Sequence, residues 1–454
     1  MSPLTAVVLA AGKGTRMRSA VPKVLHELCG RPLLAWPSAA AGEAGADEVV
    51  VVLSPGVDVG GQLPAGARVA VQEVANGTGG AVLAAREALP AQGAVLVVNG
   101  DVPLVTGQAL RSLLDTHTMS GAAATIGTAM LEDPGQYGRI VRSGDGAVQK
   151  IVEAKVGGDA TAEELAIREV NAGVYAFDAA ALHVALDRLR PDNAQGELYL
   201  TDAIEHVRAA GGVIAAHDLG PEAMQGVNDQ VEFAQVRALV QRQIIEAHQR
   251  EGVIVVDPLS TYIDHDVRIG ADARIEPGTT LKAGTVVEER AVVGPHTTAT
   301  ASTIRAGATV LHAVLVEAEV GRDASVGPFA YLRPGAVLRE GSKAGTFVEL
   351  KNTDLGAGSK VPHLSYLGDA TVGPGSNLGA ATITANYDSK RRVKHRTTIG
   401  AEVKTGVDTT LVAPVTVGDR AYTAAGSVVT DDVEPGALAV ARERQRNLKD
   451  YADR

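Results

Sequence analysis

Cysteine is almost absent from this chain, since Cys29 is the only one among 454 residues. An intramolecular disulfide is therefore excluded, and the expected location is a reducing compartment such as the cytoplasm. Aromatic residues are also scarce, at 3% of the chain, whereas glycine occurs 51 times. This composition favours tight turns and closely spaced backbone over a core filled with large rings.

Long apolar runs and an excess of positive charge are missing as well. No apolar run approaches the ~18 residues of a membrane-spanning helix, and the start of the chain has neither the basic segment nor the cleavage site of a signal peptide. We therefore expect no membrane insertion. The formal net charge of −11 argues against a nucleic-acid partner.

The most informative pattern that is present lies in the second half of the chain, where an apolar residue recurs every six positions. This period fits neither an α-helix nor an alternating strand. It is typical of a parallel β-helix, in which each six-residue step forms one flat side of a triangular coil and one side chain fills the interior. Chance spacing in a β-rich linker is the alternative, and three separate runs argue against it. The interior positions are Ile263, Ile269, Ile275, Leu281, Val287 and Val293, then Val320, Val326, Leu332 and Leu338, then Ile399, Thr405, Leu411, Val417, Thr423 and Val429.

The first half of the chain alternates short β-branched runs with helical stretches, which predicts a Rossmann-like, mostly parallel sheet covered by helices on both faces. A long helix is expected at 229–250. These assignments divide the chain into an α/β domain at 1–227, a linker helix at 228–252, and a β-helix domain with a charged tail at 253–454. The expected strands are Ala6–Leu9, Glu48–Leu53, Val69–Gln72, Ala94–Asn99 and Ala123–Thr128, and the expected helices are 79–89, 106–118, 179–189 and 197–210.

Two motifs follow expected strands of the first domain. The glycine-rich turn Leu9–Met17 exposes backbone N–H groups that suit a phosphate or a base edge. It is not a P-loop, because Lys13 precedes Gly14, and it lacks the third glycine of a dinucleotide fingerprint. The second motif places Asp101 at the end of an apolar strand, where its carboxylate suits Mg²⁺. Taken singly, a structural glycine turn and an aspartate that caps a turn remain alternatives.

Polar residues interrupt the six-residue pattern of the second domain in three places. Arg333 and Lys351 suit a sugar phosphate. His363 titrates near neutral pH and suits removal of a proton from an attacking amine. For His363 alone, an inert, hydrogen-bonded histidine is the alternative.

Further motifs accompany these segments: Pro22–Leu25, Gly100–Leu104, Tyr137–Ile140, Ile151–Glu153, Asn171–Gly173, Gln195–Asp202 and Gly226–Asn228. With the β-helix attached, nearly the whole chain resembles the bifunctional bacterial N-acetylglucosamine-1-phosphate uridyltransferase/glucosamine-1-phosphate N-acetyltransferase family. The resemblance implies a nucleotidyltransferase domain, a left-handed parallel β-helix, a homotrimer, a cytoplasmic location and a role in UDP-GlcNAc synthesis for cell-envelope polymers. It also implies glucosamine-1-phosphate, acetyl-CoA, GlcNAc-1-phosphate and UTP as substrates, with Mg²⁺ as the cofactor.

The resemblance assigns the first site to the α/β domain. Asp101 and Asn228 would hold Mg²⁺, while Arg16 and Lys23 would hold the phosphates of UTP. The residues expected to bind UTP or UDP-GlcNAc are Leu9, Ala10, Ala11, Gly12, Gly14, Arg16, Lys23, Gln72, Gly77, Thr78, Asn99, Gly138, Glu153, Asn171 and Asn228.

The resemblance assigns the second site to the β-helix. His363 would be the catalytic base, and we expect Glu349 to orient its imidazole. Lys394 falls where the family has a lysine, and Val407 replaces a usual serine. The residues expected to bind the acceptor are Arg333, Lys351, Tyr366 and Asn377, and those expected to bind acetyl-CoA are Ala380, Asn386, Tyr387, Val407, Ala425 and Arg442.

The chain departs from the family pattern at the base-binding segment 72–81. The family usually reads Gln-x-Glu-Gln-x-Gly-Thr-Gly-His-Ala there, and the second Gln and the His are missing from this sequence. Asn99 also stands where the family often has Tyr. Two alternatives stay open: a single-activity sugar-1-phosphate nucleotidyltransferase whose β-helix is only a trimerisation scaffold, and a non-catalytic protein that binds sugar nucleotides.

Overall fold

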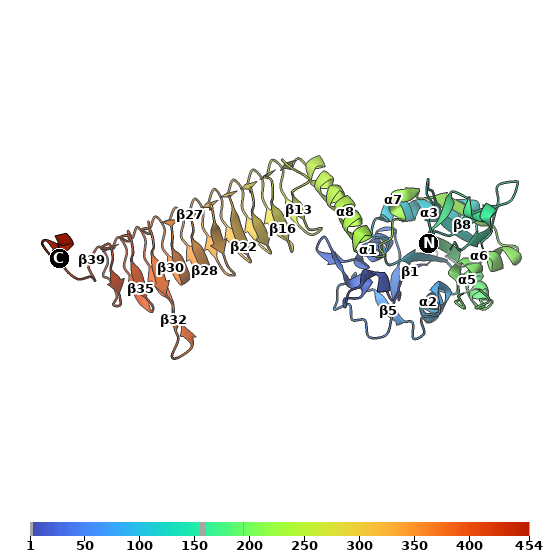
Figure 1. Ribbon diagram of the computed structural model, residues 1–454, viewed down its shortest axis with the longest axis horizontal. Coiled ribbons are helices and arrows are strands. Elements are labelled where there is room, and N and C mark those ends of the chain that lie inside the picture. Colours follow the sequence, from blue (N-terminus) through green and yellow to red (C-terminus); the bar gives the residue numbers. More distant parts are fainter. Residues whose placement is uncertain (1–2, 155–159, 194, 454) are drawn as a thin grey trace. The chain divides into compact units, whose positions relative to one another are not determined.

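The computed structural model describes residues 3–154, 160–193 and 195–453. The chain divides into two compact units, Met1–Val240 and Gln241–Arg454, each with its own hydrophobic core (Figure 1). Within the described ranges, no helix combines the length and the apolar character that a membrane span requires.

The boundary between the units falls inside helix α8 (Gln230–Arg250), which the sequence predicted at almost the same residues. The second half of this helix belongs to the second unit and is held to its first coil by Gln241, which is buried. Its Nε2 donates to the main-chain oxygen of Ile263 (2.7 Å), and its Oε1 accepts from the Ile263 N–H (2.9 Å). Both polar atoms of a buried side chain are thereby paired, as burial requires.

A nine-stranded sheet forms the centre of the first unit. The strands on its main path are, in spatial order, β11 (Ile214–Asp218), β7 (Ala124–Met130), β10 (Glu169–Asp178), β6 (Ala94–Asn99), β1 (Leu4–Ala10), β4 (Glu48–Leu53) and β5 (Arg68–Val71). A hairpin of β8 (Arg139–Arg142) and β9 (Val148–Val152) joins β10. Strand β1 pairs in parallel with β4 and β6, whereas β10 runs antiparallel between β6 and β7. The predicted mostly parallel sheet is confirmed.

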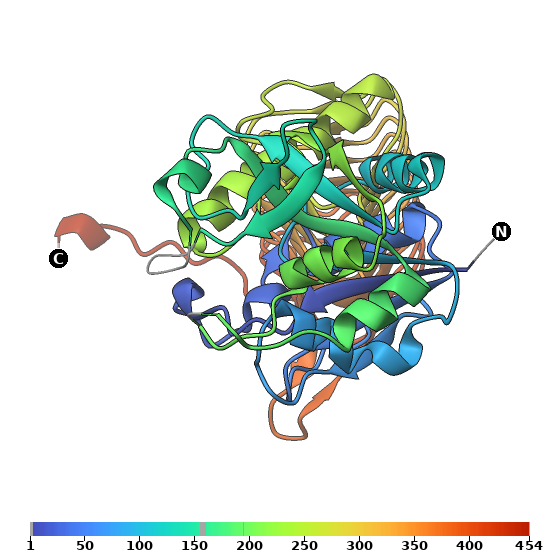
Figure 2. The same cartoon turned by 90° about the vertical axis from the view of Figure 1, so that its right-hand side faces the viewer.

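Helices cover both faces of this sheet because its strands are apolar on both sides (Figure 2). Successive side chains of a strand point to opposite faces, and on β1 they feed two cores: Val7 belongs to one, Ala6 and Val8 to the other. The core with Val7 includes buried residues of three helices, α2 (Thr78–Ala84), α5 (Ala179–Leu186) and α6 (Leu200–Ala209). The opposite core includes residues of α1 (Ala35–Glu43) and α3 (Gly107–Ser120).

The second unit is a left-handed parallel β-helix of short strands, from β12 (Ile254–Val255) to β39 (Leu438–Ala439) (Figure 1). Ile275 lies opposite Val293 in a parallel pair, 18 positions later. That spacing is three six-residue sides, or one coil, so the fold predicted from the period is confirmed. One face consists of β12, β15 (Arg274–Ile275), β18 (Val292–Val293), β21 (Thr309–Val310), β24 (Ser325–Val326), β27 (Lys343–Thr346) and β29 (Lys360–His363).

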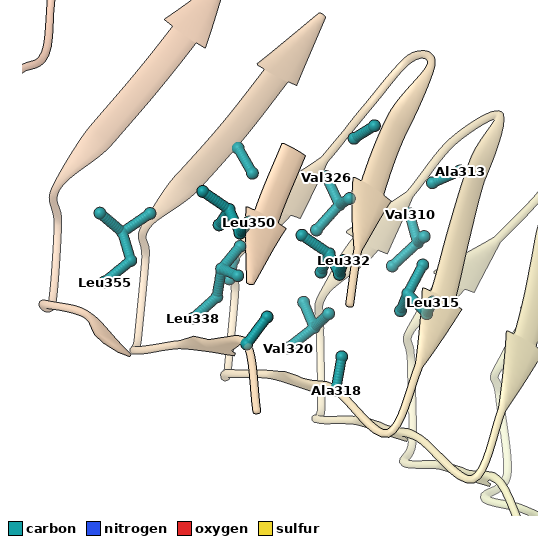
Figure 3. Close-up of a cluster of buried hydrophobic side chains, with 14 of the residues drawn as sticks. Val310, Ala313, Leu315, Ala318, Val320, Val326, Leu332, Leu338, Leu350 and Leu355 are labelled. Atoms are coloured by element: carbon teal, nitrogen blue, oxygen red, sulfur yellow. The ribbon is translucent and has the colours of Figure 1, made fainter. Parts of the chain in front are cut away.

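Every predicted interior position of the β-helix is buried, with at most 8% of its surface exposed. Figure 3 shows side chains such as Val320, Val326, Leu332 and Leu338 meeting inside the coils. Burying a side chain of this size contributes roughly 1.5–3 kcal/mol. The repeated interior residues therefore form the hydrophobic core of this unit, and each contributes to its stability.

Two of the predicted interior positions carry threonine, and the hydroxyl of each is hydrogen-bonded to the hydroxyl of another buried threonine. Thr405 Oγ1 lies 2.8 Å from Thr382 Oγ1, and Thr423 Oγ1 lies 2.8 Å from Thr409 Oγ1. A buried hydroxyl is tolerated when such a partner satisfies it. A hairpin of β32 (Tyr387–Asp388) and β33 (Val393–Lys394) projects from the coils near this end (Figures 1 and 2).

Candidate active sites

The first candidate site is a cavity of about 630 Å³ at the carboxyl ends of β1 and β6. Ligands of open α/β sheets bind at this edge of the sheet. All residues that the sequence suggested for the nucleotide, the sugar and the metal line this cavity, except Gly14 and Arg16. Arg16 lines an adjoining cavity of about 840 Å³. The structure thus gathers segments that lie as far apart as Leu9 and Asn228, and their binding roles stay predictions.

Each cation expected to bind phosphate is paired with an oxygen expected to bind the metal. Lys23 Nζ lies 2.5 Å from Asp101 Oδ2, and Arg16 Nη2 donates to Asn228 Oδ1 at 2.8 Å. Gly14 makes this arrangement possible, because it has a left-handed φ of +57° and a Cβ there would lie 2.6 Å from the Cβ of Lys23. The glycine-rich turn can therefore lie directly against the lysine.

The oxygens of Asp101 and Asn228 suit a hard divalent cation. Mg²⁺ takes oxygen ligands, and it is commonly held by one or two protein side chains together with water and substrate phosphates. The N–H of Val227 donates to the main-chain oxygen of Asp101 (2.9 Å), which holds the two segments together. Because the described residues contain no cluster of three or more His, Cys, Asp or Glu side chains fit for a metal, an ion here would need phosphate oxygens to complete its shell.

The end of the cavity that is expected to bind the base is formed where α2 begins. Thr78 Oγ1 accepts a hydrogen bond from the Leu200 N–H (3.0 Å), and the Gly79 N–H donates to the oxygen of Leu198 (2.8 Å). Gly77 has a φ of +102°, and a Cβ there would lie 2.5 Å from that same oxygen of Leu198. The loop before α2 is therefore held rigidly against the segment that precedes α6.

The end of the cavity that is expected to bind the sugar (the sugar end) contains two hydrogen-bonded pairs, of which the sequence predicted one member each. Thr201 Oγ1 donates to Glu153 Oε1 at 3.2 Å. Asn171 Nδ2 donates to the hydroxyl oxygen of Tyr175 at 2.6 Å, while Asn171 Oδ1 accepts from the Gly173 N–H at 3.0 Å. Glu153 and Asn171 were expected, and their partners Thr201 and Tyr175 were not. Their place in the motifs Gln195–Asp202 and after Asn171–Gly173 was the available signal.

One carboxyl group near the sugar end has an unusual acidity. Burial, followed by the negative charges of Glu205 and Glu153, raises the pKa of Asp202 to about 6. This group therefore changes its charge close to neutral pH. Its position directly after Thr201, which contacts Glu153, couples it electrostatically to the cavity.

The second candidate site lies on one flat face of the β-helix. Its neighbouring strands are β25 (Ala330–Leu332), β28 (Glu349–Leu355) and β30 (Tyr366–Val372). Tyr331 lies opposite Glu349, which lies opposite Tyr366, and Lys351 lies opposite Gly368. The Tyr366 hydroxyl reaches sideways over Gly368, where a Cβ would collide with it. Register alone thus brings the expected acceptor residues Lys351 and Tyr366 together.

The expectation that Glu349 orients the His363 imidazole is wrong in this structure. Glu349 Oε1 accepts a hydrogen bond from Arg333 Nη1 at 2.8 Å. That contact raises the pKa of the guanidinium and holds this expected acceptor ligand in place. His363 ends strand β29, lies opposite Thr346, and is exposed. Its side chain makes no hydrogen bond with the residues that the structure describes, so both ring nitrogens are open to a substrate.

Asp369 is the central residue of this face, and sequence reasoning did not select it. Its carboxylate accepts from Asn352 Nδ2 (2.7 Å) and from Asn386 Nδ2 (2.5 Å). Burial raises its pKa, but these two hydrogen bonds and the charges of Lys351 and Lys394 outweigh that effect, and the pKa is lowered. Contact with Lys394 in turn lowers the pKa of Lys351. Two lysines held this close form a strong site for a phosphate.

The residues expected to bind acetyl-CoA follow one edge of successive coils. A Cβ added to Gly379 would lie 2.6 Å from the oxygen of Gly406, and one added to Gly406 would lie 2.5 Å from the nitrogen of Ala425. The Arg442 Cδ lies 3.8 Å from where a Cβ of Gly426 would be. This edge is therefore smooth and lined by small residues. Two more expected residues directly follow its glycines in the chain, Ala380 and Val407.

Two expected residues lie beside this edge. Asn377 pairs with Lys360 of β29 on one side and with Lys404 on the other. Tyr387 starts the projecting hairpin, lies opposite Lys394, and is exposed. The structure places both near the other residues of the second site, and their roles stay predictions.

Comparison with known proteins adds independent evidence. Residues 6–165 match the model of the MobA-like NTP transferase domain. A protein of Mycolicibacterium vanbaalenii is 48% identical over 100% of this chain and 94% of its own length. One of Streptomyces coelicolor is 49% identical over 100% and 94%, and one of Kineococcus radiotolerans is 50% identical over 99% and 92%. Each of the three carries the name bifunctional protein GlmU.

Proposed function

This chain belongs to the family of the bifunctional GlmU proteins, and from that membership and its two sites we propose how its residues carry out two reactions. It is a bifunctional enzyme of UDP-GlcNAc biosynthesis, with uridyltransferase and acetyltransferase activities. The single-activity alternative is set aside, because relatives that match both units over nearly their whole length carry the bifunctional name. The non-catalytic alternative is set aside on the same ground.

The second unit acetylates glucosamine-1-phosphate. The amine attacks the thioester carbon of acetyl-CoA, an amide bond forms, the carbon–sulfur bond breaks, and His363 takes the proton that the nitrogen loses. Arg333, Lys351 and Lys394 hold the phosphate of the acceptor. The small-residue edge at Ala380 and Ala425 leaves room for the extended acetyl donor.

The first unit joins the product to UTP. An oxygen of the sugar phosphate attacks the α-phosphorus of UTP in line, and the bond to pyrophosphate breaks. No covalent intermediate with the protein is required, so positioning and charge stabilisation supply the rate. Lys23 and Arg16 hold the phosphates, Gln72 and Thr78 face the base, and Glu153 with Asn171 holds the sugar.

Asp101 and Asn228 would hold Mg²⁺. When bound, the ion neutralises charge on the phosphates and on the departing pyrophosphate. In the structure Lys23 and Arg16 donate to the same two oxygens. The protein's part is thus to keep the oxygens of Asp101 and Asn228 paired and in place before a ligand binds.

The assembly and its location are part of the proposal. We propose a cytoplasmic homotrimer packed through flat faces of the β-helix. A flat, repetitive face and a solitary, buried Cys29 support it.

The observation that carries the proposal is the pairing of Lys23 and Arg16 with Asp101 and Asn228 at one end of a cavity that also contains Gln72. The test measures pyrophosphate release with GlcNAc-1-phosphate, UTP and Mg²⁺, and release of the CoA thiol with glucosamine-1-phosphate and acetyl-CoA, on one preparation. We expect both activities, with Mg²⁺ needed only for the first. Release of pyrophosphate with metal chelated, or with another nucleotide in preference to UTP, would contradict it.

A further inference from the structure

The side-chain amide of Gln72 is held in one orientation by its own loop. Its Nε2 donates to the main-chain oxygen of Gly77 (3.0 Å) and to Asn76 Oδ1 (2.9 Å). A carbonyl oxygen can only accept, so the atom of Gln72 that faces Gly77 is the nitrogen. The second proton of that nitrogen needs an acceptor, and Asn76 Oδ1 provides it.

The other end of the same amide is left for a ligand. Gln72 lines the cavity and is only 7% exposed, yet its Oε1 accepts no hydrogen bond from the residues the structure describes. Gln72 Oε1 is also not among the fully buried side-chain atoms of the described residues that lack a hydrogen-bond partner. The oxygen therefore reaches the cavity as a free acceptor.

Asn76 is itself fixed from two directions. Its main-chain oxygen accepts from the Leu198 N–H (2.7 Å), and its own N–H donates to the oxygen of Val74 (2.9 Å). Its side chain fills the space above Gly80, where a Cβ would lie 2.6 Å from Asn76 Cγ and would collide with Oδ1. Asn76 can occupy this place only because position 80 carries glycine instead of the family's histidine.

We infer that Asn76 is a positioning residue, which with Gly80 turns Gln72 so that its acceptor oxygen selects a base with an N–H donor at ring position 3. The inference rests on the proposed function and specifies how this chain reads uracil although its base-binding segment departs from the family pattern. Uracil offers a donor at N3, whereas N3 of cytosine is an acceptor that would face the Gln72 oxygen without a proton between them. A reversed amide would favour cytosine instead.

The test compares UTP with CTP. The ratio of kcat/KM for the two nucleotides is measured for the full chain and for Asn76→Ala, which removes one of the two acceptors that hold the Gln72 amide in its orientation. Loss of one oriented hydrogen bond is expected to lower the UTP preference about tenfold. Gly80→Ala should lower it similarly, because its methyl group displaces the Asn76 side chain. In the double variant the second change should cost nothing further, since the two act as one unit.

Controls separate orientation from general damage. Asn76→Asp keeps an acceptor for Gln72 Nε2 and should retain the preference for UTP. Val74→Ala, at a side chain that is 67% exposed in the same loop, should leave the ratio unchanged. Acetyl transfer, measured on each preparation, reports that the chain is intact.

The outcomes are distinguishable. An unchanged UTP:CTP ratio in Asn76→Ala would overturn the inference, and so would an equal loss of rate with both nucleotides, which indicates a merely structural role. A wild-type chain that transfers neither nucleotide would overturn the proposed uridyltransferase function, and this inference with it.

Discussion

The two units position their polar residues by opposite means. In the first unit, the cavity gathers loops at the ends of parallel strands, from residues as distant as Leu9 and Asn228, and many of its side chains are half-buried. In the second, the site lies on an open face where register alone stacks Glu349 against Tyr366. The first site combines burial with ion pairing, whereas the second depends mainly on hydrogen bonds and charges from neighbouring coils.

Two carboxyl groups make this difference concrete. Burial dominates at Asp202 and raises its pKa to about 6. At Asp369 the two asparagine hydrogen bonds and the lysine charges prevail over burial, and its pKa is lowered. Burial thus lets Asp202 titrate near neutral pH, whereas hydrogen bonds and lysine charges favour the ionised form of Asp369 although that side chain is also buried.

The largest expected effect isolates the second site. His363→Ala removes the proposed base, and acetyl transfer should fall by about 10²–10⁴-fold, since general base catalysis is typically worth that much. Uridyl transfer by the same preparation should be unchanged. The matched control is His296→Ala, at a histidine that packs against His312 and not in this site. Equal acetylation rates in both variants would reject the assignment of the base.

The complementary variant isolates the first site. Asp101→Asn removes the charge that pairs with Lys23 and a proposed metal ligand, and uridyl transfer should fall about 10²-fold or more, as for loss of an electrostatic contact in the transition state. Acetyl transfer should persist. Asp192→Asn, at an exposed carboxylate of the same unit, serves as control. Retention of full uridyl transfer at ordinary Mg²⁺ concentration would show that the metal is held elsewhere.

A third substitution tests how much the stability of the second unit depends on the apolar side chains inside its coils. Leu332 is fully buried and follows Tyr331 of the acceptor face. Leu332→Ala should lower the free energy of unfolding of the second unit by about 2–5 kcal/mol, the usual cost of emptying a core position. Unfolding in denaturant, monitored by the loss of acetyl transfer, measures this free energy. Val314→Ala, at an exposed residue of the same face, should cost far less, and equal costs would mean that the coils are not filled as described.

The smallest expected effect concerns pH. Because the folded-state pKa of Asp202 is raised to about 6, the folded chain binds this proton more tightly than the unfolded chain does. The stability of the first unit should therefore fall as the pH rises from about 4 through 6, and then level off. Asp202→Asn should flatten that slope, as seen in the denaturant midpoint of the first unit. An identical slope in the variant would show that Asp202 is not the group responsible.

Much of the fold could be read from the sequence because its strongest signals are local. A six-residue period has no competing explanation in helices or ordinary strands, and every interior position that was predicted is buried. Strands β4 and β6 were placed at their observed bounds because each contains an uninterrupted apolar run rich in valine. By contrast, α1 was missed, since its alanine-rich, proline-containing segment Ala35–Glu43 has no apolar stripe.

The rest depends on contacts that no local pattern records. Strand β10 runs antiparallel to its neighbours β6 and β7. The direction of a strand depends on its place in the whole sheet, which its own residues do not record. The carboxylate of Asp369 is held by hydrogen bonds from Asn352 and Asn386, each 17 positions away on a neighbouring coil. The hydrogen bond between Asn76 and Gln72 depends on how two side-chain amides are oriented. Motifs predicted which residues line the first cavity, whereas the hydrogen-bond partners of those residues appeared only in three dimensions.

The regular coils of the second unit also constrain how its chemistry can change over evolutionary time. Neighbouring strands lie ~4.8 Å apart, so each added or lost coil shifts everything beyond it by that increment. Coils of other lengths also occur, since Val293 pairs with Val310 17 positions later and Val310 pairs with Val326 16 positions later, and all three side chains stay buried. The distance between the expected acceptor-binding residues and the edge expected to bind acetyl-CoA therefore changes in steps of one coil. Substrates of intermediate length can be accommodated only by side chains or by a projecting loop such as the β32–β33 hairpin.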